Sequence, residues 1–420
     1  MTKLLLEPIL EGIQQTHFFN GRLLSGEDLA REQAAGRNAC RRLGRAIGEG
    51  VAYGLQVVET LNVSSKESPV VTIRAGAAIN RRGDVLELVN DTELSLIGGS
   101  TERPPAPSAF KECEPPTSSG FVVGEGAYVL VIGPTEGREG RAPTSGLGNV
   151  TASCNARYTV EGVRFRLVEI RLGKDVLNDT GRLRNRLAHR CFGTDVTAQF
   201  SASPFLSGAT SYGAIDTLRA QGTVTDCDVP LAMILWTKAG GIEFIDRWAV
   251  RRRLSKRPVD PSWDPVIGDR RASETEAMFL QFQDHIEDIR INDPNPAAIA
   301  ASAHFAFLPP VGFVRLKTDP QPRGFDPARF FGDYAWSRAM GIDVAQVRAI
   351  CLEALDHEPI NLSVPDRIHI YKVFAQTQSG GPDPTARDFV LFATPALRRP
   401  RRHSTRIRTV KPPTNIRINP

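Results

Sequence analysis

The sequence predicts an α+β protein that is rich in β-structure, and three observations lead to this fold class. The 420 residues include 36 glycines and 30 prolines, a usage that favours short strands joined by many turns. Runs of branched apolar residues between turn signals fill much of the first half. Apolar residues at helical spacing occur in only a few segments. In chain order we expect an N-terminal helix, a small antiparallel β-unit, a larger β-rich middle, an α+β C-terminal region and a basic tail.

Residues 1–48 are predicted to form an N-terminal helical docking segment. Phe18 and Phe19 belong to an apolar entry, and Ser25 followed by two acids is typical of a helix start. A small, apolar face then recurs at intervals of three, four or seven residues, at Leu29, Gly36, Cys40, Leu43 and Ile47. Because small residues allow close helix packing, we expect this segment to dock on a neighbouring subunit or to oligomerise, with assembly contacts at Phe18, Phe19, Leu29 and Leu43.

Residues 49–98 are predicted to form a small antiparallel β domain. Branched runs at 51–63, 70–74 and 85–89 are separated by turn residues. The turn before the last run contains Arg82-Gly83-Asp84, a tripeptide that some integrins bind on exposed loops. A glycine between polar residues is also what a hairpin turn requires, and we interpret it as a turn.

Residues 99–120 hold five prolines and are predicted to be a linker or long loop, and residues 121–255 a β-rich middle domain. We expect a short buried strand at 128–132, loops at 133–153 and 193–226, and a half-solvated alternating strand at 157–172. Two apolar runs at 229–236 and 242–245 flank a glycine-containing turn, which predicts a hairpin.

The second half is predicted to contain a linker and helix over 256–300 and an α+β C-terminal domain over 301–395. The helix begins at Ser273 and buries one face, made of Met278, Phe282, Ile286 and Ile289. In the C-terminal domain we expect strands near 311–316, 367–374 and 389–392 and a helix from Asp343.

Residues 396–420 form a predicted basic tail. The stretch 398–420 carries eight cations and no acid, so the overall net charge of +5 leaves 5 − 8 = −3 for residues 1–397. We predict that the tail is an arm on an acidic neighbour, with contacts at Arg398, Arg399, Arg401 and Arg402. A disordered polar end and a nucleic-acid contact are the alternatives, although no aromatic residue for base stacking lies between the arginines.

The sequence gives two indications of cellular context. Its first apolar run is only three residues long, too short for a secretory signal, and no stretch is long enough to cross a membrane. We therefore expect cytoplasmic synthesis, with export by a dedicated machine or by lysis left open as the route to an extracellular or cell-associated particle. The six cysteines form no CxxC pair, which disfavours zinc ribbons. We expect them to be reduced and partly buried, with disulfides left open for an exported protein.

No catalytic constellation emerges from the sequence. The seven histidines do not form metal-binding motifs, and the glycine-rich stretches do not match phosphate-binding loops. His285 and His357 each lie beside acids and could bind a cation, but a solvated helix surface explains both patterns as well. The triplet at 226–228 could bind calcium or simply end a loop before a strand. We expect no enzyme, no cofactor and no metal site.

Several short stretches carry a resemblance. They are FFNGRLL at 18–24, EDL at 27–29, GVAYGL at 50–55, VTIRAGAAI at 71–79, VPLA at 229–232, WAVRR at 248–252 and FLPPVG at 307–312. This set resembles a family of uncharacterised bacterial proteins found with contractile injection systems and phage-tail-like particles. Its start is similar to baseplate-attached tail-fibre proteins. The resemblance implies membership of such a particle and no catalytic residue.

Together these observations predict a structural component of a phage-tail-like contractile injection particle, at the baseplate or on a fibre. Its expected partners are other subunits of the particle, and by analogy with tail fibres it forms a trimer; nucleic acid is not an expected partner. The alternative is a surface- or carbohydrate-binding adhesin of the same particle, using Trp236, Trp248, Trp263 or Trp336 as an aromatic platform. A hydrolase that uses scattered acids is the third hypothesis.

Overall fold

The protein is a mixed α+β protein, as the sequence predicts. The computed structural model describes residues 12–60, 64–66, 68–97, 124–140, 142, 156–195, 213–256, 268–317, 323–332, 340–363, 368–374 and 389–394. The predicted linker at 99–120 and the basic tail, with Arg398, Arg399, Arg401 and Arg402, lie outside the described residues. So do Trp263 and Trp336.

Two small antiparallel sheets follow the N-terminal helix α1 (Gly26–Ile47). The first has the order β1 (Gly50–Gly54), β4 (Gly76–Ile79) and β5 (Val85–Leu88). The second has the order β2 (Val57–Glu59), β3 (Val70–Ile73) and β6 (Thr92–Ser95). The β4–β5 connection turns at Gly83, whose φ of 86° is readily adopted by glycine, so the predicted turn is confirmed.

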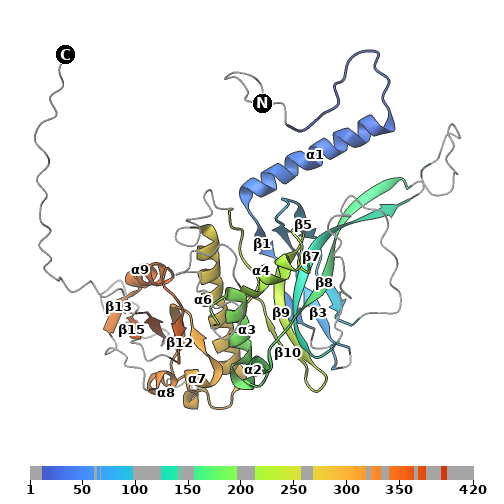
Figure 1. Ribbon diagram of the computed structural model, residues 1–420. Coiled ribbons are helices and arrows are strands. Elements are labelled where there is room, and N and C mark those ends of the chain that lie inside the picture. Colours follow the sequence, from blue (N-terminus) through green and yellow to red (C-terminus); the bar gives the residue numbers. More distant parts are fainter. Residues whose placement is uncertain are drawn as a thin grey trace, which may run out of the picture.

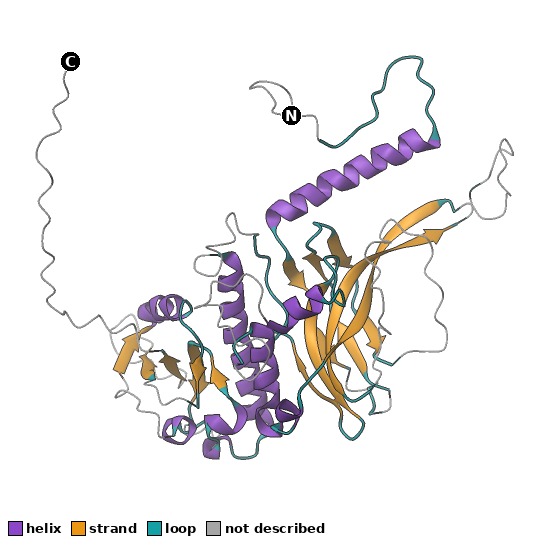
Figure 2. Cartoon of the chain, in the orientation of Figure 1, coloured by secondary structure: helices purple, strands orange, loops and turns teal. Residues whose placement is uncertain are grey.

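A four-stranded antiparallel sheet, the central sheet, packs between the N-terminal β-unit and a layer of helices (Figures 1 and 2). Its order is β10 (Gly241–Asp246), β9 (Val229–Thr237), β7 (Gly126–Glu139) and β8 (Tyr158–Ile170). The predicted hairpin and the alternating strand are confirmed as β9–β10 and β8.

The predicted loop from residue 133 is wrong at its start, because β7 continues to Glu139. Its pairing with β8 runs from Ala127 opposite Ile170 to Glu139 opposite Tyr158. Pairing with β9 ends at Ile132, so Pro134 lies where β7 has one free edge. A proline lacks the N–H of a central strand position but is tolerated at such an edge. Strand pairing therefore outweighs the turn-like local sequence.

Helices cover one face of this sheet. They are α2 (Lys174–Leu177), α3 (Leu183–Phe192), α4 (Gly213–Ala220) and the long α6 (Asp269–Asn292), with a 3-10 turn at Thr180–Arg182. A second 3-10 turn, Pro296–Ala298, lies in the C-terminal region. Helix α4 corrects the prediction of an irregular stretch over 193–226, since Ala214 and Leu218 join the core. The predicted start of α6 at Ser273 is also wrong: Gly268 is the N-cap, and Ser273 is buried one turn inside the helix.

Strand β7 contributes to two hydrophobic cores. Ala127, Val129 and Val131 pack with the helix layer, whereas Tyr128, Leu130 and Ile132 pack with the N-terminal β-unit. Alternate side chains of a strand point to opposite faces, so one strand supplies both cores. The described parts of the predicted 49–98 and 121–255 domains therefore share a core.

Helix α6 joins the central core to the C-terminal one. Ala277 and Met278 belong to the central core, whereas Phe282 and Ile286 belong to the C-terminal core, which confirms the predicted buried face. Around it lie α7 (Ala301–His304), α8 (Pro327–Phe331), α9 (Val344–Ala354) and the two-stranded pair β11 (Phe307–Leu308) and β14 (Ile360–Asn361).

The C-terminal sheet has the order β12 (Val311–Arg315), β16 (Phe389–Ala393), β15 (His369–Phe374) and β13 (Met340–Asp343). Its pairs are antiparallel except for β13 with β15, which are parallel. The three predicted strands of this region are confirmed. Among the described helices none is long and apolar enough to cross a membrane.

The described cysteines differ in state. Cys227 is disulfide-bonded, so the expectation of reduced thiols is wrong for this residue. Cys40, Cys191 and Cys351 are free; Cys40 is exposed and Cys191 is buried. Burial raises the pKa of the Cys191 thiol to about 12, which keeps it protonated and unreactive near neutral pH.

His189 makes the fold sensitive to acid. Its ring is buried, stacks on Phe307 at 4.8 Å between ring centroids, and lies with Nδ1 2.6 Å from the Thr194 hydroxyl. Burial lowers its pKa to about 3. Between pH 6.5 and that value the unfolded chain binds a proton that the folded chain does not. Stability is therefore fully present above pH 6.5 and falls by roughly 1 kcal/mol per pH unit as the pH drops through this window.

We expect His189→Gln to flatten this slope in urea unfolding measured between about pH 7 and pH 5. Burial also lowers the pKa of His285, so part of the slope should remain. An unchanged slope in the variant would show that His189 is not a source of the acid sensitivity.

Candidate functional site

Helix α1 begins and ends where the sequence predicts. The Ser25 hydroxyl accepts a hydrogen bond from the Asp28 N–H, and the Asp28 carboxylate accepts one from the Ser25 N–H. The Ser25 hydroxyl also donates to the Asp28 carboxylate, and the two bonds that this carboxylate accepts from Ser25, together with Arg22 at 2.6 Å, lower the pKa of Asp28. Gly48 caps the other end with φ 123°. Figure 1 shows the helix standing away from the sheets, next to them only at its C-terminal end.

That C-terminal end is anchored through a contact between two glycines. A Cβ atom built on Gly44 would lie 2.2 Å from the Gly83 carbonyl oxygen, and one on Gly83 would lie 2.1 Å from the Arg41 carbonyl oxygen. Such distances are possible only without side chains. Arg41 also pairs with Asp84, and Arg37 lies 3.6 Å from Glu136 of β7. The helix is therefore tied to the β4–β5 turn and to β7 by backbone approach and ion pairs.

The apolar stripe of α1, defined as Leu29, Gly36, Cys40, Leu43 and Ile47, lies in solvent. The exposed fractions of its large side chains are 53% for Leu29, 67% for Leu43 and 52% for Ile47. A Cβ atom at Gly36 would meet no atom within 4 Å. The only buried residues of α1 are Ala35 and Gly44. The predicted face thus exists, but within the described chain nothing covers it.

The apolar entry before α1 is exposed as well. Phe18 and Phe19 have exposed fractions of 53% and 61%, and the Arg22 guanidinium lies 6.0 Å from the centre of the Phe19 ring. Thr16 fastens this segment to the helix, because its N–H donates to the Glu32 carboxylate and its hydroxyl donates to the Asp28 carbonyl. The structure therefore places the predicted contacts Phe18, Phe19, Leu29 and Leu43 on one exposed N-terminal element.

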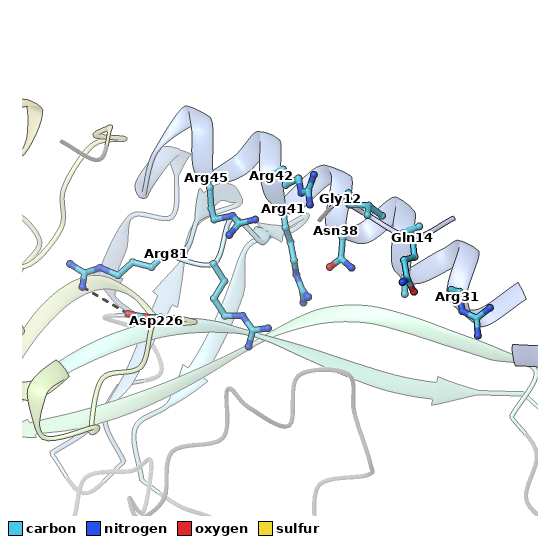
Figure 3. Close-up of a pocket in the computed structure, with 13 residues that line it drawn as sticks. Gly12, Gln14, Arg31, Asn38, Arg41, Arg42, Arg45, Arg81 and Asp226 are labelled. Carbon is cyan, nitrogen blue, oxygen red and sulfur yellow. Dashed lines mark ion pairs between the residues drawn. The ribbon is translucent and has the colours of Figure 1, made fainter. Parts of the chain in front are cut away.

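The opposite side of α1 faces an arginine-lined cleft of about 670 Å³. Figure 3 shows Arg31, Asn38 and Arg41 projecting from the helix toward the strands below it. The arginines that line the cleft are Arg31, Arg41, Arg42 and Arg45 of α1 and Arg81 and Arg82 of the turn, and the lining contains one acid, Asp226. At 100° per residue, the α1 members lie roughly opposite the apolar stripe.

These cleft arginines were not predicted as a site. Their spacing is visible in the sequence, since Asn38, Arg41, Arg42 and Arg45 recur at intervals of one, three and four. A helical projection would have placed them on one face. Arg81 and Arg82 line the cleft only because the Gly44–Gly83 contact brings the β4–β5 turn next to α1. No local sequence pattern indicates that contact.

The other candidates from the sequence have structural partners. Asp84 of the Arg82-Gly83-Asp84 turn is buried and bound to Arg41 and Asn80, so it is not presented to a receptor. Asp228 ends a loop before β9, pairing with Arg166 at 2.5 Å. Trp236 is buried and Trp248 half-buried.

His285 corrects the expectation of a solvated helix surface. It is buried, with its ring 4.8 Å from that of Phe305. The three neighbouring acids pair with arginines instead: Asp284 with Arg247, Glu287 with Arg290 and Asp288 with Arg184. Within the described chain no three His, Cys, Asp or Glu residues gather as a metal-binding group.

Comparisons with protein-family models and with curated proteins find no match for this sequence. The case for a function therefore depends on the geometry of α1 and on the resemblance given above.

The glycine anchor leads to a prediction with a control in the same helix. Gly44→Ala should push α1 off the turn and cost about 1–3 kcal/mol locally, because the new Cβ would overlap the Gly83 carbonyl. Hydrogen exchange of α1 amides should accelerate. Gly36→Ala adds its Cβ in open space and should stabilise the helix by up to ~1 kcal/mol. Equal α1 protection in both variants, measured in dilute protein, would contradict the anchor.

Proposed function

We propose that this protein is a structural subunit of a phage-tail-like contractile injection particle and that α1 is its assembly element, pairing with α1 of a second copy. The observation that carries the proposal is the solvent exposure of the apolar stripe. Helix α6 has an apolar face at similar spacing, and that face is buried at Phe282 and Ile286. An amphipathic helix that leaves its apolar face in water has the character of a protein-interaction element.

The charge distribution of α1 favours an antiparallel pair. Residues 26–34 carry three acids and one arginine, a net charge of 1 − 3 = −2, whereas residues 35–47 carry four arginines and no acid, a net charge of +4. An antiparallel copy places each acidic half beside a basic half and opposes the two helix dipoles. A parallel bundle, as a fibre-like trimer would use, brings the arginine-rich halves together.

The stripe also matches itself in this orientation. Consider two antiparallel helices that cross at the level of residue 38. Residues that lie equally far before and after this position then face each other, so Leu29 faces Ile47 of the other copy and Gly36 faces Cys40 of the other copy. The large apolar side chains at the two ends of the stripe thus meet each other, and the Cys40 thiol of one copy faces the open space at Gly36 of the other. Small residues at the centre let the backbones approach closely.

The stripe alone supports only weak pairing. Its three large side chains are about half exposed, and burying the exposed half of each contributes about 1 kcal/mol. For the six side chains of two copies this is ~6 kcal/mol. Association costs about 4–15 kcal/mol in lost translational and rotational freedom. Phe18 and Phe19, on the same exposed N-terminal element, supply further apolar surface. We therefore expect pairing at high local concentration, such as that within a particle.

Charge on the stripe should abolish the pairing. We expect Leu29→Glu/Leu43→Glu to shift the molar mass from dimer to monomer in light scattering at high protein concentration. Ala30→Glu/Ala46→Glu adds the same charge at exposed α1 positions outside the stripe and should keep the dimer. A native protein that stays monomeric at every concentration, or two variants with the same mass, would overturn the proposed pairing.

The orientation can be tested with a mixed disulfide. A Gly36→Cys/Cys40→Ser chain mixed with the native chain places one thiol at position 36 opposite Cys40 of the other copy. Mild oxidation should give mainly the cross-linked heterodimer, because Cα atoms within about 7 Å can be bridged. The native chain alone should cross-link poorly. Efficient Cys40–Cys40 cross-linking of the native chain would instead indicate parallel helices.

A further inference from the structure

The residues that line the arginine-lined cleft are strongly cationic, although several of the arginines have acidic partners. Six arginines and one acid line it, a net charge of 6 − 1 = +5. Some of the arginines are already committed: Arg31 to Asp28 at 3.7 Å, Arg41 to Asp84, and Arg81 to Glu49 at 2.6 Å. Arg42 and Arg45, one turn apart on α1, pair with no acid among the described residues. The cleft therefore combines fixed and uncommitted guanidinium groups.

The orientation of α1 makes this charge unusual. A helix on a protein surface normally turns its apolar face to the body and its charged face to water. Here the cationic face lines an open cleft beside the body and the apolar face lies in water. Like charges in a partly enclosed cleft repel more strongly than in bulk water, because solvent screens them less. An anion in the cleft relieves this repulsion and bridges α1 to the β4–β5 turn.

The shape of the charge indicates an extended ligand. Arg31 and Arg45 are fourteen residues apart on α1, which at 1.5 Å per residue is about 21 Å. A single phosphate or carboxylate covers only one end of such a row. An extended peptide of about six residues covers it, at ~3.3 Å per residue. Guanidinium groups bind carboxylates through two parallel hydrogen bonds, so a row of acidic side chains fits the row of arginines.

The lining favours peptide over nucleic acid. None of the described residues that line the cleft is aromatic, so the bases of a single strand would have no ring to stack on. The side-chain amides of Asn38 and Gln14, which both line the cleft, can instead form hydrogen bonds with the backbone of a peptide. We propose that this cleft binds an extended acidic peptide segment of a partner protein, with Arg42 and Arg45 as the principal binding residues.

The cleft and the apolar stripe lie on roughly opposite sides of α1, but Arg42 and Arg45 also belong to the basic half of the helix. Peptide binding is therefore measured in dilute protein, where we expect the native chain and the variants to be monomeric. The probe is a fluorescein-labelled hexaglutamate peptide, with binding to the full-length protein followed by fluorescence anisotropy. Arg42→Glu/Arg45→Glu should weaken binding roughly tenfold or more. Arg329→Glu/Arg348→Glu changes the charge equally at exposed arginines of α8 and α9 and should leave binding unchanged. Raising salt from about 0.05 M to about 0.3 M should weaken native binding several-fold.

Every outcome decides the inference. Loss of binding in the Arg42/Arg45 variant alone supports it, provided that this variant keeps the native circular dichroism spectrum and the native molar mass. Absence of hexaglutamate binding overturns it, as does equal weakening in both variants. An oligothymidylate of the same charge that binds more tightly than hexaglutamate also overturns it, in favour of nucleic acid. Full displacement by inorganic phosphate at equal concentration of charge would show a point anion site in place of a peptide groove.

Discussion

The alternation of side chains along β7 is the constraint on which the rest of the architecture depends. Val129 and Val131 face the helix layer, while Leu130 and Ile132 face the N-terminal β-unit, and all four are buried. A shift of one residue in the pairing of β7 would exchange the two sets and disrupt both cores at once. The register with β8 and β9 therefore fixes the N-terminal unit on one face of the sheet and α3, α4 and α6 on the other.

The position of α1 follows from this layering. Because both faces of the central sheet are covered, the sheet offers no apolar surface on which α1 could bury its stripe. The C-terminal end of α1 lies instead against the β4–β5 turn, a polar element with a glycine at its tip. Gly44 approaches Gly83 more closely than any side chain would permit, and Arg41 reaches Asp84. Backbone contact and ion pairs thus set the orientation of the helix, and the apolar stripe turns outward as a consequence.

Many of the helices and strands could be predicted from the local sequence, and those that could not have a physical reason. The ends of α1, its stripe, the buried face of α6 and the β9–β10 hairpin all follow from caps, spacing and turn residues. The extension of β7 past Pro134 does not, because thirteen paired positions with β8 outweigh a turn-like segment. Helix α3 escapes prediction because Leu187 and Phe192 are surrounded by arginines and a histidine, of which Arg186 and His189 are themselves buried. Periodicity shows which residues of α1 share a face, but tertiary contacts decide which face meets the body.

The two faces of α1 are coupled through its attachment. The helix touches the body mainly at its C-terminal end, so its N-terminal half is held by its own cap and by the Thr16 contacts. Restricting the motion of α1 would reduce the entropy that a second helix loses when it packs on the stripe. An anion that bridges α1 and the β4–β5 turn would impose such a restriction without touching the stripe. Salt would then act on pairing in two ways, since it screens the acidic and basic halves of the paired helices and also releases the anion that steadies each helix. By contrast, the apolar contribution of the stripe depends little on salt at these concentrations, so the salt dependence of pairing reports the electrostatic part alone.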